Sequence, residues 1–189
     1  MMILETNRLL MRDFVDADWQ AVFVYQSNPL YLLYSHWTHP TENDVCEFVQ
    51  MFINQQKEKP RTKFQLAVVL KKENRLIGNC GIRVNDSELR EANIGYELNP
   101  LYWGQGYATE AAQAILKFGF TELKMHRIWS WCVAENIASS RVLEKIGMCR
   151  EGHLQEKGLI KGRWHDNFIY AIHENDWKIS QDIAILNES

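Results

Sequence analysis

The spacing of apolar side chains changes several times along this chain, and each change marks a different predicted element. Residues 9–14 are typical of a short strand, and residues 17–27 carry apolar side chains at helical spacing until Pro29 interrupts the pattern. Thr41 is a favoured residue to cap a helix, and Asp44 follows three positions later as in a capping box. The sequence therefore predicts two helices before the main sheet.

Strict alternation of apolar and polar residues dominates the middle of the chain. Residues 64–70 and 76–84 alternate on either side of a short polar turn, which predicts a β-hairpin. Residues 92–99 alternate in the same way, and Glu97 falls on their polar face because successive side chains of a strand point to opposite sides. The apolar face of this strand carries Ile94, Tyr96 and Leu98.

Helical and strand-like spacing alternate again in the second half. Residues 108–119 carry an apolar stripe at helical spacing, residues 126–133 are typical of a strand, and residues 136–147 are typical of a short capped helix. An antiparallel pair of strands is expected to end the pattern at 167–172. This order predicts an α/β fold with a mixed, mostly antiparallel central sheet of about six to seven strands, flanked by about four helices.

Length and charge narrow the class of protein. The 189 residues suffice for a single domain, which we expect over 1–189 with a folded core of about 5–177. The formal net charge is −3 and no long basic run occurs, which argues against a nucleic-acid partner. No apolar run approaches the ~20 residues of a membrane span, and no secretory leader is evident. We therefore expect a cytoplasmic protein without a membrane partner.

The four cysteines are widely separated and form no Cys-x-x-Cys motif, which is typical of a reducing compartment. Cys132 falls in a predicted strand close to the helix at 136–147. An acetylated Cys132 is one hypothesis, but a packed, unreactive thiol is favoured because no neighbouring His or Lys would lower its pKa. His36 and His39 have no third partner at ligand spacing, so we expect no metal site.

Residues 104–110 form a glycine-rich turn between a predicted strand and a predicted helix. The first N–H groups of a helix have no partner within the helix, and the helix dipole makes this end attractive to phosphate. A Walker-type loop would require a lysine directly after Gly106, and none occurs before Lys117. A dinucleotide fingerprint would require a third glycine where Ala108 stands. The turn therefore predicts a phosphate site of another kind.

Residues 103–108 resemble the coenzyme A pyrophosphate loop of the GNAT superfamily of N-acetyltransferases, Arg/Gln-x-x-Gly-x-Gly/Ala, with Trp103 at the Arg/Gln position. That departure is expected to remove one polar contact. Residues 98–111 are most similar to the RimJ/RimL branch, the ribosomal-protein N-terminal acetyltransferases. Residues 136–148 resemble the superfamily helix that lies beside the pantetheine arm. The resemblance covers nearly the whole chain.

The resemblance implies acetyl-CoA as co-substrate and no metal. It places Asn136 against the cofactor amide and Ser139 close to the cofactor sulfur. The residues implied to bind the cofactor are Leu98, Asn99, Gly104, Gln105, Gly106, Tyr107, Ala108, Thr109, Asn136 and Ser139.

Transfer of an acetyl group to an amine requires a base, a donor to the oxyanion and an acid for the leaving thiolate. Glu97 is predicted as the base, acting directly or through water, with Glu91 as a weaker rival. The resemblance implies the N–H near Leu98 as oxyanion donor. Ser139 is predicted as the acid, because the tyrosine that many superfamily members use would align with Leu143. A solvated strand glutamate and an ordinary helix-turn serine are the alternatives for Glu97 and Ser139.

An amine is implied as the acceptor, and the branch favours the α-amino group of a protein N-terminus. A polyamine, an antibiotic or another small amine is the alternative, as is a non-catalytic module that only binds or senses acyl-CoA. His165 and Asp166 resemble a feature of the branch that lines the acceptor site. A monomer and a homodimer are both compatible with the sequence.

Overall fold

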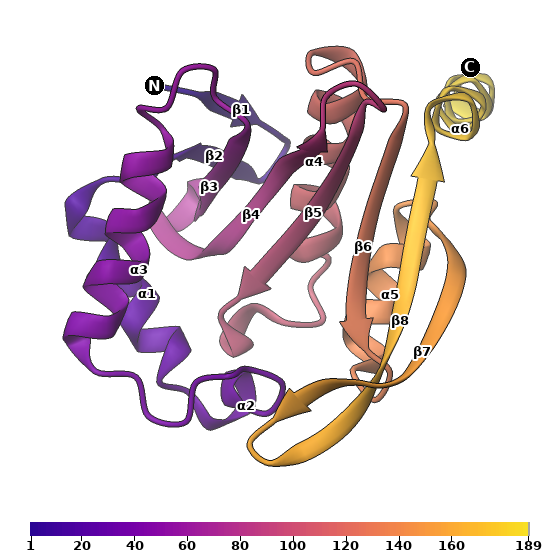
Figure 1. Ribbon diagram of the computed structural model, residues 1–189. Coiled ribbons are helices and arrows are strands. Elements are labelled where there is room, and N and C mark those ends of the chain that lie inside the picture. Colours follow the sequence, from indigo (N-terminus) through magenta and orange to yellow (C-terminus); the bar gives the residue numbers. More distant parts are fainter. Residues whose placement is uncertain (189) are drawn as a thin grey trace.

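The computed structural model describes residues 1–188, with side chains described as far as Ile183. The chain forms one mixed sheet in the order β1-β2-β3-β4-β5-β6-β8-β7 (Figure 1). Neighbouring strands are antiparallel except β5 and β6, which are parallel. The strands are β1 (Ile3–Glu5), β2 (Leu9–Asp13), β3 (Lys63–Leu70), β4 (Arg75–Asp86), β5 (Glu91–Leu98), β6 (Arg127–Val133), β7 (Cys149–Ile160) and β8 (Arg163–His173).

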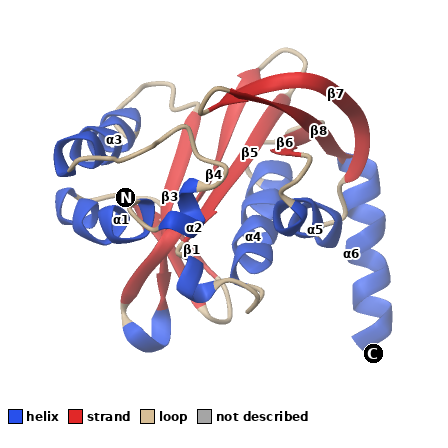
Figure 2. Cartoon of the chain, turned by 90° about the horizontal axis from the view of Figure 1, so that it is seen from below, coloured by secondary structure: helices blue, strands red, loops and turns tan. Residues whose placement is uncertain are grey.

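Helices cover both faces of this sheet (Figure 2). The helices are α1 (Trp19–Gln26), α2 (Pro29–Leu32), α3 (Glu42–Gln55), α4 (Tyr107–Thr121), α5 (Ile137–Lys145) and α6 (Glu174–Glu188). Helices α1 and α3 contact β4 and β3 on one face, whereas α4 and α5 lie on the other. Alternate residues of β3 therefore enter two separate cores: Val68 packs with α4, and Val69 packs with α1 and α3.

The predicted α/β fold is confirmed, and the elements number slightly more than predicted. Residues 1–188 contain eight strands and six α-helices. The three residues of β1 are too few for alternation to be recognised, although they pair with β2. Pro29, taken from the sequence as a helix stop, is the first residue of α2, where its missing N–H costs nothing. Both β1 and α6 extend beyond the predicted folded core of 5–177.

The capped helix predicted after Thr41 is confirmed as α3. The Thr41 side chain accepts from the Asp44 N–H at 3.2 Å, and the Asp44 carboxylate accepts from the Thr41 N–H at 2.7 Å. None of the helices described in residues 1–188 combines the length and apolar character that a membrane crossing requires.

Strands β4 and β5 approach each other closely where β5 ends. The β3–β4 register shifts beside Val68, so that Ile77 is an extra residue in β4, and the Ile77 carbonyl accepts from the Asn99 N–H at 2.7 Å. Gly78 lies opposite Leu98, and a Cβ atom at this position would lie 2.2 Å from the Glu97 carbonyl oxygen. A glycine in β4 therefore sets the position of the end of β5.

Candidate active site

The candidate site lies where the parallel strands β5 and β6 separate, a place that we call the opening. These parallel strands pair only from Glu91 with Arg127 to Asn93 with Trp129, and beyond this point they diverge (Figure 1). The Ser130 hydroxyl donates to the Ile94 carbonyl at 2.9 Å, which shows that Ile94 directs its backbone groups toward β6.

Backbone groups of β5 line this opening. The N–H groups of successive strand residues point to opposite sides, so the N–H groups of Tyr96 and Leu98 point in the same direction as that of Ile94, toward β6. Both residues lie beyond Asn93, the last residue of β5 that pairs with β6. The Asn99 N–H points the other way, to Ile77 of β4. The Leu98 N–H, the predicted oxyanion donor, thus points to the edge of β5 that faces β6, beyond the last residue pair of the two strands.

The glycine turn leads from this edge into α4. Gly104 and Gly106 have φ angles of 75° and 80°, the left-handed region that favours glycine. Gly106 is the N-cap of α4, and no side chain caps the first N–H groups of the helix. In the part of the chain that the structure describes, no capping side chain bonds the backbone donors at this helix start, which fits the diphosphate of coenzyme A.

Trp103 and Asn99 brace the turn from within. The Trp103 indole N–H donates to the Leu98 carbonyl at 2.8 Å, so the residue that departs from the superfamily pattern makes a polar contact to the strand instead. The Asn99 side chain accepts from the Leu101 N–H at 3.0 Å and is buried. Asn99 therefore shapes the turn, since its N–H and its side-chain oxygen both have partners within the protein.

The start of α5 lies against the same part of β5. Asn136 caps the helix by accepting from the Ser139 N–H at 3.1 Å. The Tyr96 hydroxyl donates to the Ser139 carbonyl at 3.0 Å and lies 3.0 Å from the Ser139 Oγ atom. Leu143 is fully buried, and the phenol that reaches this part of α5 comes from Tyr96 of β5.

Tyr96 was not recognised as a site residue from the sequence. Alternation places it on the apolar face of its strand, with Ile94 and Leu98. A phenol in such a stripe usually finds a hydrogen-bond partner for its hydroxyl, and this was the available signal. Burial raises the pKa of Tyr96 well above its usual value, so the phenol stays protonated over the range in which enzymes work.

Cys132 is a packed thiol. Its Sγ atom lies 3.3 Å from the Ser140 hydroxyl, and burial raises the pKa of Cys132. The thiolate is therefore disfavoured, which argues against an acetyl-cysteine intermediate.

Glu97 lies on the opposite face of β5, toward α1. Its Oε2 atom accepts from the Asn79 amide at 2.9 Å, from the Gln26 amide at 3.2 Å and from the Tyr25 hydroxyl at 3.4 Å. Burial and the charge of Glu97 together raise the pKa of Tyr25. These three donors come from α1 and β4, so they could not be assigned to Glu97 from the sequence. They hold one carboxylate oxygen.

Glu97 and Ser139 are thus brought to the two sides of one opening, and they do not contact each other. Neighbouring side chains of β5 point to opposite faces, so Tyr96 reaches Ser139 while Glu97 faces α1. Glu91 is excluded as a rival base by its position. It pairs with Arg127 at 2.7 Å at the first residue of β5, six residues from Glu97 or about 20 Å along a strand.

The predicted pair His165 and Asp166 contacts residues other than Glu97 and Ser139. The His165 Nδ1 atom is 3.2 Å from the Glu135 carboxylate, whereas Asp166 pairs with His153 at 2.7 Å. The predicted pair His165 and Asp166 therefore has separate partners. Within the described part of the chain, no three His, Cys, Asp or Glu side chains gather as a metal site, and this includes His36 and His39.

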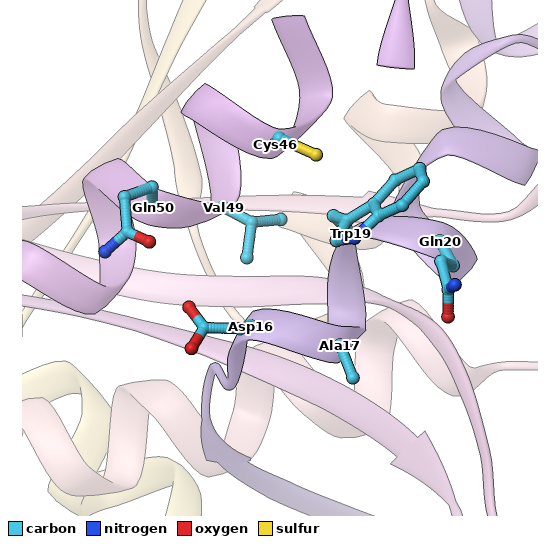
Figure 3. A pocket seen from close by; sticks show the side chains of 7 residues that line it. All are labelled: Asp16, Ala17, Trp19, Gln20, Cys46, Val49 and Gln50. Carbon is cyan, nitrogen blue, oxygen red and sulfur yellow. The ribbon is translucent and has the colours of Figure 1, made fainter. Parts of the chain in front are cut away.

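A pocket of about 410 Å³ lies between α1 and α3 (Figure 3). Trp19 and Cys46 line it from the two helices. It contains none of the predicted site residues, so the pocket is separate from the opening between β5 and β6.

Comparison with known proteins agrees with this geometry. Residues 8–149 match the acetyltransferase (GNAT) domain family, and the chain therefore belongs to this family. It is 42% identical over 177 residues to the uncharacterized N-acetyltransferase YnaD of Bacillus subtilis (strain 168), covering 93% of this chain and 99% of that protein. A crystal structure of a GNAT-family acetyltransferase from Bacillus anthracis is 39% identical, with a TM-score of 0.80 and coverage of 92% and 99%.

More distant relatives differ in their acceptors. The [ribosomal protein uS5]-alanine N-acetyltransferase of Escherichia coli (strain K12) is 24% identical over 180 residues, covering 92% of each chain. A spermidine N-acetyltransferase from Vibrio cholerae, in complex with CoA and spermine, has a TM-score of 0.77 at 21% identity and covers 92% of this chain and 99% of that one. The chain is an N-acetyltransferase that uses acetyl-CoA and an amine acceptor.

Proposed function

We propose that this enzyme acetylates the α-amino group at the N-terminus of a protein, by direct transfer within a ternary complex. The observation that carries the proposal is the opening between β5 and β6, which has Glu97 on one side and Ser139 on the other. A base and an acid on opposite sides of one opening suit acetyl transfer, because the amine can attack the thioester from one face while the thiolate leaves on the other.

Acetyl-CoA supplies the acetyl thioester when it is bound. Glu97 accepts a proton from the attacking amine, directly or through water, and its Oε2 is held by three donors so that the carboxylate keeps one orientation. The Leu98 N–H donates to the oxyanion that develops as the C–N bond forms. Ser139 donates its hydroxyl proton to the sulfur as the C–S bond breaks and takes up a proton from solvent, with Tyr96 orienting the Ser139 side chain.

The charges near the opening favour an acceptor with a single cation. Glu135 is a carboxylate that directly precedes the N-cap of α5, and its backbone carbonyl accepts from the Tyr34 hydroxyl of the segment after α2 at 3.1 Å. Its carboxylate lies 3.5 Å from Arg163 and 3.2 Å from His165. Arg163 offsets the charge of Glu135, which leaves Glu97 to attract the amine. A polyamine would need several free carboxylates in a row, whereas an α-ammonium needs one.

The similarity to the uS5-alanine acetyltransferase along 92% of both chains supports a protein N-terminus. The spermidine acetyltransferase shares the fold at 21% identity, and a small amine is the alternative acceptor.

An acceptor screen tests the proposal. Purified enzyme and acetyl-CoA would be incubated with peptides that begin with small residues, with the same peptides blocked at the α-amino group, and with spermidine. Release of free thiol and the mass of the product report the transfer. We expect transfer to the free peptides and none to the blocked ones. Transfer to spermidine alone would refute the peptide acceptor and leave the acetyltransferase intact.

Glu97→Gln tests the site itself. It keeps the shape of the side chain, and we expect kcat/KM to fall by about 10²- to 10⁴-fold. Glu91→Gln is the matched control, because it alters a carboxylate on the same strand that faces Arg127, and it should leave kcat/KM within about threefold of the wild type. Equal rates for the wild type and Glu97→Gln would overturn the assignment of the base.

A further inference from the structure

Arg8, in the turn before β2, lies against the glycine turn although about a hundred residues separate the two. Its NH1 group donates to the Gln105 carbonyl at 2.9 Å, and its Nε donates to the Glu110 carboxylate at 2.6 Å. The guanidinium carbon lies 4.3 Å from the centre of the Tyr107 ring. Arg8 therefore contacts residues on both sides of Gly106.

One nitrogen of Arg8 has no partner in the described part of the chain. The two hydrogen bonds of the guanidinium use Nε and NH1, which leaves NH2 without a partner there. This NH2 atom lies 3.4 Å from the place where a Cβ atom of Gly106 would stand. Two N–H donors of Arg8 therefore lie beside Gly106, the N-cap of α4, where no side chain caps the helix.

Arg8 also offsets the negative charge of Glu110. A carboxylate in the first turn of α4 would repel a phosphate bound at the same helix end. Its oxygens instead accept from Arg8 Nε, from the Arg8 backbone N–H at 2.8 Å and from the Thr6 hydroxyl at 2.6 Å. The cation of Arg8 offsets the carboxylate and is held in place by it.

We infer that Arg8 is part of the diphosphate site: its NH2 group donates to a phosphate oxygen of acetyl-CoA, while its Nε and NH1 groups hold the turn and offset Glu110. Guanidinium groups recognise phosphate through paired N–H donors. The Arg/Gln position of the superfamily pattern is Trp103 here, and its indole is bonded to Leu98. In this chain the cation reaches the turn from a distant part of the sequence. The inference rests on acetyl-CoA as co-substrate.

The test compares two acetyl donors. Acetyl-CoA carries the diphosphate, whereas S-acetylpantetheine carries the same thioester without it. For Arg8→Gln we expect the Kd for acetyl-CoA, measured by calorimetry, to rise by about 10- to 100-fold, as for the loss of a hydrogen bond to a charged group. The KM for S-acetylpantetheine should stay within about twofold of the wild type, because this donor does not reach Arg8.

Two further variants keep the result interpretable. Lys71→Ala removes a cation that bonds Glu5 at 3.0 Å and the Thr6 carbonyl at 2.7 Å, in the same region but without contact to the turn, and it should leave the Kd for acetyl-CoA unchanged. The double variant Arg8→Gln/Glu110→Gln also removes the carboxylate that has lost its guanidinium partner. It should bind acetyl-CoA more tightly than Arg8→Gln alone.

The results that would contradict the inference on Arg8 can be told apart. If Arg8→Gln raises the Kd for acetyl-CoA and the KM for S-acetylpantetheine by the same factor, Arg8 is only structural and the inference is overturned. An unchanged Kd for acetyl-CoA overturns it as well. If the wild type itself does not bind acetyl-CoA, the co-substrate is wrong and the role of Arg8 falls with it. A failed peptide screen with intact binding leaves the inference on Arg8 standing.

Discussion

Replacing Gly78 by alanine should damage both stability and catalysis through a single contact. The new Cβ atom would lie 2.2 Å from the Glu97 carbonyl oxygen and 2.9 Å from the Leu98 Cα atom. Ordinary contact begins at 3.4 Å, so the two strands must separate by about 1 Å. The neighbouring atoms are backbone, which cannot swing aside as the end of a flexible side chain can.

The size of the effect follows from this displacement. Overpacking in a close-packed interior typically costs about 1–3 kcal/mol. At roughly 2–4 °C per kcal/mol for a chain of this size, Tm should fall by about 2–12 °C. The displaced atoms belong to Glu97 and Leu98, the proposed base and oxyanion donor, and a shift of about 1 Å at reacting groups reduces the rate by about 10²-fold.

The assay combines thermal unfolding with steady-state kinetics, and Gly152→Ala is the matched control. Gly152 is also a strand glycine without a positive φ angle, and its new Cβ atom would meet the Ile169 Cβ atom at an ordinary 3.5 Å. We expect its Tm and kcat/KM to match the wild type. A Gly78→Ala enzyme with wild-type Tm would refute the steric reasoning, and a lowered Tm with unchanged kcat/KM would refute the catalytic assignment.

Three further predictions follow from single contacts. Tyr96→Phe removes the hydroxyl that orients Ser139, so kcat should fall about tenfold or more while the KM for acetyl-CoA changes little. Equal kcat values for the wild type and Tyr96→Phe would exclude this role. Cys149 is exposed, Cys46 is half-buried, and burial raises the pKa of Cys80 to about 12. Cys149→Ser should therefore remove the fastest phase of labelling by a thiol reagent in the native state and leave the slower reaction of Cys46, whereas Cys80→Ser should change neither phase. Burial alone would raise the pKa of Glu110, but hydrogen bonds from Thr6 and Arg8 outweigh burial and lower it. The stability that Glu110 adds is therefore present above its ordinary pKa of 4.5 and lost as the pH falls through the lower folded value, so the Tm difference between wild type and Glu110→Ala should shrink on acidification.

Much of the fold was predictable because the signals are local. The caps at Thr41 and Asn136 are formed as predicted, since a cap depends on residues within three positions. The hairpin of β3 and β4 follows from alternation around a short turn. β1 and α2 were missed because three or four residues carry too little pattern to be recognised.

The candidate site was predicted only in part. The motif placed the glycine turn and α5 in the correct order, and alternation placed Glu97 on the polar face of β5. The partners of these residues were not predictable. Tyr96 belongs to an apolar stripe, and Arg8 precedes Glu110 by about a hundred residues, so no spacing rule joins them.

The sequence by itself determined the elements and their faces, because backbone periodicity and capping act over a few residues. It also determined the family, through two motifs that lie far apart but are each continuous. The tertiary structure decided where β5 and β6 separate, which groups hold Glu97, and that Arg8 reaches the glycine turn. These contacts form between residues distant in the chain, and they depend on how strands are ordered and twisted within the sheet, which no local pattern encodes.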